Sequence, residues 1–158
     1  MMNFIKRFSF KQKAVLLLLI MSFSAASYFI YDRYFASKMV IANIESYNFT
    51  DIDIVDLFVN DTWGGNSHAH SGAGGGICCV LIPQKWRLGL VVNIKWQKTE
   101  DPKWYSAVAP IPKYAESAGL QVLFLENNQV KVYVNDYWPC TPMHPMPKEN
   151  LCGRQKNK

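Results

Sequence analysis

The chain has 158 residues, of which 49% are hydrophobic, 14% aromatic and 18% charged. These values exclude intrinsic disorder and favour one folded domain with its own core. The net charge of +5 does not indicate nucleic-acid binding, because from Asp32 onward 13 Lys and Arg oppose 12 Asp and Glu. A nucleic-acid-binding domain would need a basic face, so we expect no nucleic-acid partner.

An apolar segment near the N-terminus predicts a membrane anchor. Ala14–Tyr31 (AVLLLLIMSFSAASYFIY) contains no charged residue and just reaches the length that spans a bilayer as a helix. Basic residues but no acidic ones precede it, namely Lys6, Arg7, Lys11 and Lys13. Because such residues stay cytoplasmic, we expect residues 1–13 in the cytoplasm, a single pass through the inner membrane at 14–31, and the remainder in the periplasm.

A cleaved signal peptide is the alternative interpretation of the same segment. Ala14–Phe23 has the length of a signal-peptide core, and Ser24-Ala25-Ala26 resembles a cleavage site. The apolar character continues through Tyr31, which favours an uncleaved signal anchor. Both interpretations deliver the following residues to the same compartment, with residues 32–38 as a linker.

Residues 39–138 predict an all-β domain, a β-sandwich or small barrel. Ile52, Ile54, Leu57 and Val59 alternate in two pairs with a phase break at Val55, which indicates a bulged strand. The apolar run 77–82, ended by a proline, is typical of a buried strand. Within residues 90–97, Leu90, Val92, Ile94 and Trp96 face one way, while the alternate residues Val91, Asn93, Lys95 and Gln97 face the other, which is typical of a strand.

The second half of the domain continues this pattern. Residues 104–111 predict an edge strand, because Pro110 and Pro112 cannot donate to a neighbouring strand. Residues 120–125 and 130–134 predict a hairpin around Glu126–Gln129, where asparagine tolerates positive φ. One helical turn is expected at 113–119. The proline-rich residues 139–158 are expected to form an irregular tail.

The four cysteines all follow the apolar segment, so an oxidising compartment makes disulfides reasonable. We expect no bond between Cys78 and Cys79, since adjacent side chains of a strand point to opposite faces. Cys140 and Cys152 are the disulfide candidates, with unpaired thiols as the alternative. There is no CxxC pair for zinc.

Catalytic and metal-binding motifs are incomplete. Gly72–Gly76 runs into an apolar strand rather than a helix, which argues against phosphate binding. His68 and His70 could hold a metal only if the fold brought His144 to them, and Ser71 lacks the G-x-S-x-G elbow. We therefore predict no enzyme activity, no cofactor and no metal site.

A partner-binding surface is the remaining prediction. Large aromatic residues in polar segments are typical anchors of protein interfaces, and charges mainly steer association. The predicted contact residues lie in 63–75 and at 137–138, with an acidic patch beside them. They are Trp63, His68, His70, Tyr137 and Trp138, with Asp51, Asp53, Asp56 and Asp61.

A specific pattern runs through the domain. Three glycines (74–76) are followed by Cys78-Cys79-Val80 and then by Pro83, Lys85 and Trp86. Accompanying residues are Asn60, Trp63-Gly64-Gly65-Asn66, His70, Gly72, Gly89-Leu90, Lys95-Trp96, Pro110, Asn135, Tyr137 and His144-Pro145. With this pattern, residues 46–147 resemble a family of exported Gram-negative proteins catalogued as a domain of unknown function.

The resemblance implies a role in the cell envelope but no catalytic residues. Relatives in that family are often encoded beside lipase-like effectors of type VI secretion, which suggests immunity proteins. The resemblance therefore implies a membrane-anchored periplasmic immunity protein that neutralises a phospholipase toxin. The alternatives are a structural or adaptor protein of the envelope without a toxin partner, and a metal-binding protein that uses the histidines.

Overall fold

The computed structural model describes residues 9–34, 38–72 and 76–146. It divides into two compact units, Met1–Ser37 and Lys38–Lys158.

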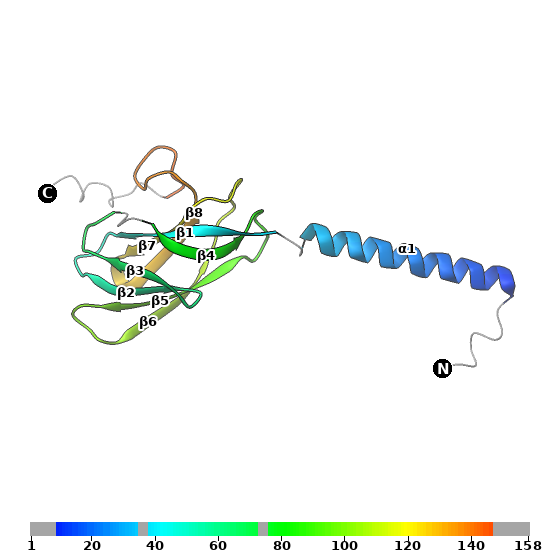
Figure 1. Ribbon diagram of the computed structural model, residues 1–158, viewed down its shortest axis with the longest axis horizontal. Helices are drawn as coiled ribbons and strands as arrows, with labels where there is room; N and C mark the ends of the chain where they lie inside the picture. Colours follow the sequence, from blue (N-terminus) through cyan, green and yellow to red (C-terminus); the bar gives the residue numbers. More distant parts are fainter. Residues whose placement is uncertain (1–8, 35–37, 73–75, 147–158) are drawn as a thin grey trace. The chain divides into compact units, whose positions relative to one another are not determined.

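The described part of the first unit contains one helix, α1 (Phe10–Tyr34), drawn in blue in Figure 1. A capping box sets its start: the Ser9 amide donates to Gln12 Oε1 at 2.9 Å, and the Gln12 amide donates to Ser9 Oγ at 3.4 Å. Within it, Lys11–Tyr31 is long and apolar enough to cross a membrane, with a mean hydropathy of 2.0. The predicted apolar helix is thus confirmed, and it begins four residues before Ala14.

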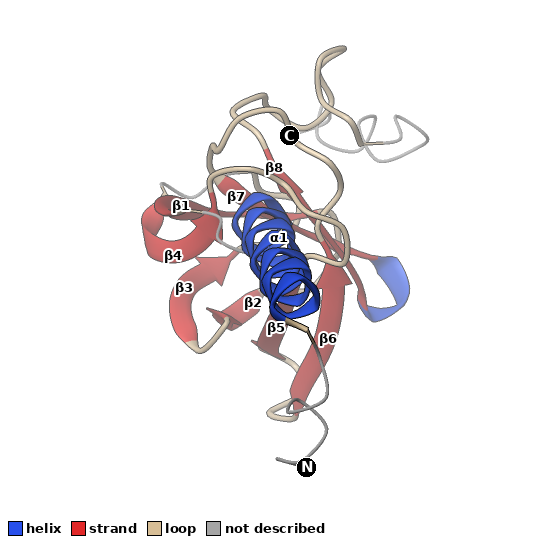
Figure 2. Ribbon diagram, turned by 90° about the vertical axis from the view of Figure 1, so that its right-hand side faces the viewer, coloured by secondary structure: helices blue, strands red, loops and turns tan. Residues whose placement is uncertain are grey.

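The second unit contains the strands (Figure 2). They are β1 (Met39–Asn48), β2 (Ile54–Val59), β3 (Thr62–Ser67), β4 (Ile77–Pro83), β5 (Val91–Lys98), β6 (Trp104–Pro110), β7 (Leu120–Leu125) and β8 (Gln129–Val134). Sheet A has the order β4-β1-β7-β8 and sheet B the order β3-β2-β5-β6. Every neighbouring pair is antiparallel except β1 and β7, which run parallel. The all-β prediction is confirmed.

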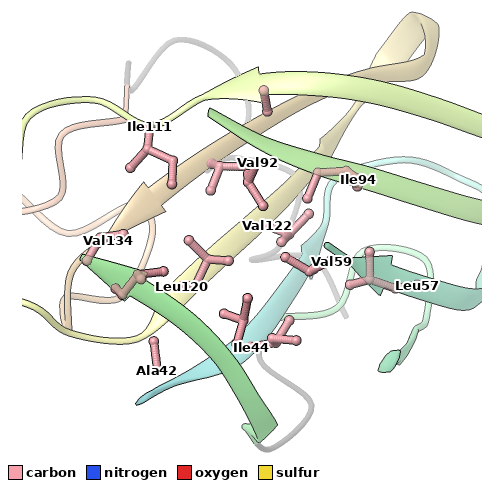
Figure 3. Close-up of a cluster of buried hydrophobic side chains, with 14 of the residues drawn as sticks. Ala42, Ile44, Leu57, Val59, Val92, Ile94, Ile111, Leu120, Val122 and Val134 are labelled. Atoms are coloured by element: carbon pink, nitrogen blue, oxygen red, sulfur yellow. The ribbon is translucent and has the colours of Figure 1, made fainter. Parts of the chain in front are cut away.

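The main core lies between the two sheets (Figure 3). Val92, Ile94 and Trp96 supply the buried face of β5, while the alternate residues of that strand are exposed or half-buried, as the sequence predicts. Sheet A contributes Ile44, Leu120 and other side chains to the same cluster. Burial of these apolar side chains is the main stabilising term of such a sandwich.

A second, smaller cluster covers the outer face of sheet A. Tyr47, Phe49, Leu123 and Tyr133 lie on this face, and Met146 from the C-terminal segment packs against them. As a result β7 is buried on both faces along its whole length. This explains its continuous run of apolar and uncharged residues.

Several sequence predictions on individual strands can now be compared with the structure. The bulge at Val55 is confirmed, because the β2–β5 register passes from Ile54–Lys98 to Asp56–Gln97. The β6 edge position and the 126–129 hairpin are also confirmed, with Asn127 and Asn128 at φ of 58° and 59°. The helical turn at 113–119 is wrong: residues 115–116 form a bend, and the rest of this segment has no regular secondary structure. The buried-strand prediction for 77–82 is wrong as well, because β4 is an edge strand whose Leu81 is 59% exposed.

The two ends of the sandwich carry different sets of loops. The proximal end is the end at which β1 begins. Pro83, the last residue of β4, pairs with Met39 and so lies at this end. Leu90 precedes β5 at the same end, and its carbonyl accepts a hydrogen bond from the Ile111 amide, which follows β6. The distal end holds the loops that follow β1, β3 and β5. They are joined by hydrogen bonds from the His70 amide to Thr50 and from the Thr99 amide to Asp53.

Candidate partner-binding surface

Three aromatic side chains form a group on the outer face of sheet B. Phe58 of β2 pairs in register with Trp63 of β3 on one side and with Lys95 of β5 on the other. The Phe58 ring meets Trp104 of β6 edge-on, with ring centroids 5.8 Å apart. Trp63 is 50% exposed and Trp104 is 42% exposed, so the group is open to solvent.

Polar contacts fix the orientation of these rings. The Trp63 indole Nε1 donates to Asp56 Oδ1 at 3.1 Å, and the Lys95 ammonium lies 4.5 Å from the centroid of the Trp104 ring, a cation–π contact. We call these five residues (Asp56, Phe58, Trp63, Lys95 and Trp104) the aromatic face. Its rings are held in place before any partner arrives, which lowers the entropy cost of binding.

The Val55 bulge is the reason that the aromatic face exists. A bulge adds one residue to one strand and shifts its alternation. In β2 it lets Ile54, Leu57 and Val59 all be buried. Asp56 and Phe58, which lie on either side of Leu57 in the sequence, are then directed to the outer face.

Two aspartate–histidine pairs lie at the distal end. His68 Nδ1 lies 3.2 Å from Asp53 Oδ2, and His70 Nε2 lies 2.6 Å from Asp51 Oδ1. Asp53 also accepts a 2.7 Å hydrogen bond from the Ala69 amide. These contacts tie the loop after β3 to the loop after β1.

The predicted acidic patch is divided by the fold. Asp51 and Asp53 lie at the distal end with the histidines, and Asp56 binds Trp63. Asp61 lies in the tight turn between β2 and β3, where Asn60 and Asp61 have φ of 46° and 65°, as in the hairpin turns that match strand twist. The six residues of β2 separate it from the distal pair.

Tyr137 and Trp138 belong to another surface. They follow β8, and the Trp138 ring meets Tyr47 of sheet A edge-on at 6.2 Å. Both are exposed, at 49% and 62%. The predicted contact residues therefore occupy two separate surfaces, one on sheet B and its distal loops and one on the outer side of sheet A.

A buried polar network lies beneath that second surface. His144 is 4% exposed; its Nε2 lies 2.8 Å from Gln121 Oε1, and its Nδ1 accepts from the Met146 amide at 3.0 Å. Gln121 in turn donates to Glu45 Oε2 at 3.1 Å, and the Tyr47 hydroxyl donates to the same oxygen at 3.2 Å. Burial lowers the pKa of His144. Burial, with the neighbouring carboxylate of Glu45, raises the pKa of Tyr47.

The three histidines do not come together. His144 lies in the network on sheet A, whereas His68 and His70 bind aspartates at the distal end. Among the described residues no group of three or more His, Cys, Asp or Glu is arranged to hold a metal ion. The cavity beside Asp51 has a volume of about 110 Å³, well below the roughly 300 Å³ of a small-molecule site.

The expectation for the adjacent cysteines is wrong. Cys78 and Cys79 form a disulfide with each other. Adjacent side chains point to opposite faces only in a regular strand, and the β1–β4 register jumps from Ala42–Val80 to Ile44–Ile77. Both cysteines therefore fall in the irregular part of β4, opposite Asn43. Cys140 is also disulfide-bonded, while its predicted partner Cys152 lies outside the described residues.

Some residues of the surface were not predicted from the sequence. Phe58, Lys95 and Trp104 were assigned to strands, but nothing in their spacing showed that three strands place them side by side. The alternation in residues 90–97 could have identified Lys95 as outward-facing. The position of Trp104 needed the β5–β6 register, which pairs it with Gln97.

The chain thus combines one apolar helix with an all-β sandwich that carries an exposed aromatic face. The chain belongs to a family of proteins of unknown function, DUF3304, whose model matches residues 47–132, more than half of the chain. The match runs from the end of β1 into β8 and so covers most of the sandwich. Comparisons with curated proteins and with solved structures found no match.

Proposed function

We propose that this chain is an immunity protein anchored in the inner membrane, whose periplasmic sandwich binds and neutralises a type VI secretion toxin. The observation that carries the proposal is the exposed aromatic face on sheet B. Tryptophans fixed by neighbouring groups and surrounded by polar atoms are the commonest anchors of protein interfaces. The aromatic face presents two such residues, Trp63 and Trp104, each half-exposed.

Polar groups beside the aromatic face support recognition of a charged partner. The distal loops carry Asp51 and Asp53 with their histidines, and Lys95 contributes a cation within the face itself. Charges at the rim of an interface act mainly on association rate and specificity. We assign them that role here.

Some side chains could in principle act as nucleophiles. Their contacts support binding, not catalysis, as the way in which the protein acts. The Ser71 hydroxyl donates to the His68 carbonyl oxygen at 2.6 Å, not to an imidazole nitrogen. The thiols of Cys78 and Cys79 are bonded to each other, and a disulfide sulfur is not the thiolate that nucleophilic catalysis requires. We therefore propose that the protein is not an enzyme.

The toxin class comes from the resemblance to exported proteins encoded beside lipase-like effectors. A phospholipase delivered to the periplasm would act on the membrane in which α1 is proposed to lie. An anchored inhibitor would meet it at its substrate. If the following experiment contradicts the immunity role, the alternative function is that of an envelope adaptor without a toxin partner.

Where a lipase gene lies beside this gene, the test is survival of a strain deleted for this gene when it competes with neighbours that deliver that lipase. We expect the deletion strain to be killed, the complemented strain to survive, and a strain complemented with Trp63→Ala to be killed although the variant is folded and exported. Purified wild-type protein should bind the lipase, and Trp63→Ala should bind it at least tenfold more weakly. Full survival of the deletion strain, with delivery of the lipase demonstrated, would contradict the immunity role.

The proposed orientation is tested separately. Alkaline phosphatase fused after Lys158 should be active, because four basic residues precede the apolar segment and none lies within it. An inactive fusion, with a cytoplasmic reporter active at the same position, would contradict periplasmic placement.

A further inference from the structure

The proximal end of the sandwich carries a group of cations around one exposed leucine. Lys85, Arg87 and Leu88 are exposed in the loop between β4 and β5, and Leu88 is 90% exposed, the highest value among the exposed large apolar residues of the described chain. Lys38 precedes β1, and Lys113 is exposed in the loop after β6. The exposed acidic residues of this end are Asp61, Glu116 and Asp136.

Hydrogen bonds hold these segments together as one surface. The Gln84 amide donates to the Lys38 carbonyl at 2.7 Å, which joins the loop to the start of β1. The Trp86 indole Nε1 donates to the Ile111 carbonyl at 2.9 Å, which joins the loop to the segment that carries Lys113. The positions of the cations are therefore set by backbone that is bonded to the fold.

Leu88 lies at the tip of a tight turn. The Leu90 amide donates to the Arg87 carbonyl at 3.4 Å, and Gly89 has φ of +79°. This places Leu88 and Gly89 at the two central positions of a β-turn, with glycine where positive φ is needed. A leucine at the first central position extends away from the domain, with its apolar surface in solvent.

The chain length between α1 and β1 limits how far this end can lie from a membrane. Met39, the first residue of β1, comes five residues after Tyr34, the last residue of α1. An extended chain covers at most about 3.5 Å per residue, so the interval spans at most roughly 18 Å. If α1 crosses the bilayer, the proximal end is within reach of the lipid headgroups beside it.

We propose that the proximal end docks on the outer surface of the inner membrane, with Leu88 inserted at headgroup depth and Lys38, Lys85, Arg87 and Lys113 bound to the phosphates of anionic lipids. Apolar side chains flanked by basic ones are the chemistry of interfacial attachment. The inference rests on the proposed placement of α1 in the membrane and not on the toxin. Docking of this end would hold the sandwich in one orientation and leave its distal loops facing the periplasm.

The test uses the full-length chain reconstituted in vesicles of phosphatidylcholine, with or without phosphatidylglycerol. A polarity-sensitive fluorophore is attached to Leu88→Cys and, as a matched control, to Val108→Cys, whose parent residue is 66% exposed on the outer face of sheet B. The unsubstituted chain, labelled in the same way, gives the background. When phosphatidylglycerol is present, we expect the emission of the probe at position 88 to shift to shorter wavelength and to resist quenching by aqueous iodide. The probe at position 108 should show neither change.

Charge reversal and flotation complete the design. Replacing Lys85 and Arg87 by glutamate in the Leu88→Cys chain should remove most of the shielding. Equal quenching at 88 and 108 would overturn the docking, and equal shielding with and without phosphatidylglycerol would overturn the role of anionic lipid. Flotation of the chain with the vesicles tests α1 itself, so a failed anchor and a failed docking surface give different results.

Discussion

Trp63 and Trp96 lie on opposite faces of sheet B, and the contrast between them defines a test of the aromatic face. Trp96 is 2% exposed, stacks on Tyr105 at 5.6 Å and meets Phe124 edge-on at 5.7 Å. Trp63 is half-exposed and makes one side-chain hydrogen bond, to Asp56. Replacing Trp96 by alanine should therefore destabilise the fold much more than replacing Trp63 by alanine.

Trp63→Ala should lower the free energy of unfolding by only about 1 kcal/mol, while Trp96→Ala should lower it by about 3–5 kcal/mol through the cavity it leaves. Urea denaturation of both variants beside the wild type measures this. A loss of several kcal/mol in Trp63→Ala would show that Trp63 is a core residue. Its effect on binding could then no longer be ascribed to a lost contact.

His144 gives a prediction on pH. Burial lowers its pKa, so the folded state holds the neutral imidazole while the unfolded chain titrates near its ordinary value of about 6.5. Below that value the unfolded state binds more protons than the folded state. The free energy of unfolding therefore falls as the pH decreases below about 6.5.

The variant His144→Gln isolates this effect, because glutamine keeps polar atoms at the site but does not titrate. We expect the stability of the wild type relative to the variant to decrease between about pH 7 and about pH 5. Subtracting the two urea-denaturation series cancels the titration of the other groups. A difference that stays constant across this range would contradict the assignment to His144.

At the scale of elements, local pattern predicted the strands whose burial follows strict alternation. Residues 90–97, the 126–129 hairpin and the Val55 bulge all follow from side-chain spacing and turn chemistry. β1 was not assigned as a single strand because its residues are exposed at one end and buried on both faces at the other. β3 was missed because Gly64-Gly65 weakens any strand signal.

The candidate surface was predictable only in part, because local pattern does not show which strands become neighbours. The half-exposed Trp63 and the histidine loop were identified from their local context. Their partners were not, because strands far apart in the sequence bring Trp63 beside Phe58 and Trp104. The adjacent cysteines were misjudged because the irregularity of β4 depends on its register with β1, which no local pattern encodes.

Among the described residues, Gly65 of β3 and Gly89 have positive φ, and they provide a matched pair for testing the close packing of β3 against β4. Gly65 has φ of +88°, and a Cβ added there would overlap Cδ1 of Ile77. Gly89 has φ of +79°, and a Cβ there would have nothing within 4 Å. Both alanine variants carry backbone strain of about 1 kcal/mol, but only Gly65→Ala also crowds a neighbour.

We expect Gly65→Ala to lower the free energy of unfolding by roughly 1 kcal/mol more than Gly89→Ala, since Ile77 must move. Adding Ile77→Ala should remove this excess, and denaturation of the single and double variants gives the coupling. Equal effects of the two glycine substitutions, or no coupling with Ile77, would show that β3 and β4 can relax around the added methyl group.

At the scale of the whole molecule, we expect folding and membrane attachment to be separable. In the described part of the chain, the buried residues of the two core clusters lie between Ala42 and Met146, all within the second unit. The helix would instead restrict the sandwich to a thin layer at the membrane. Restriction to a small volume raises the effective concentration of a binding partner without any new contact.

Replacing residues 1–37 by a cleavable export signal therefore tests what the helix does. The released domain should melt at the same temperature as the full-length protein and bind the lipase with the same Kd. At native expression level, however, it should protect cells less well. An unrelated single membrane helix with a basic N-terminal flank should restore protection, because only the location is required.

A melting temperature several degrees lower in the released domain would assign α1 a structural role. Full protection by the released domain would show that neutralisation takes place in the periplasm at large and that attachment serves some other purpose.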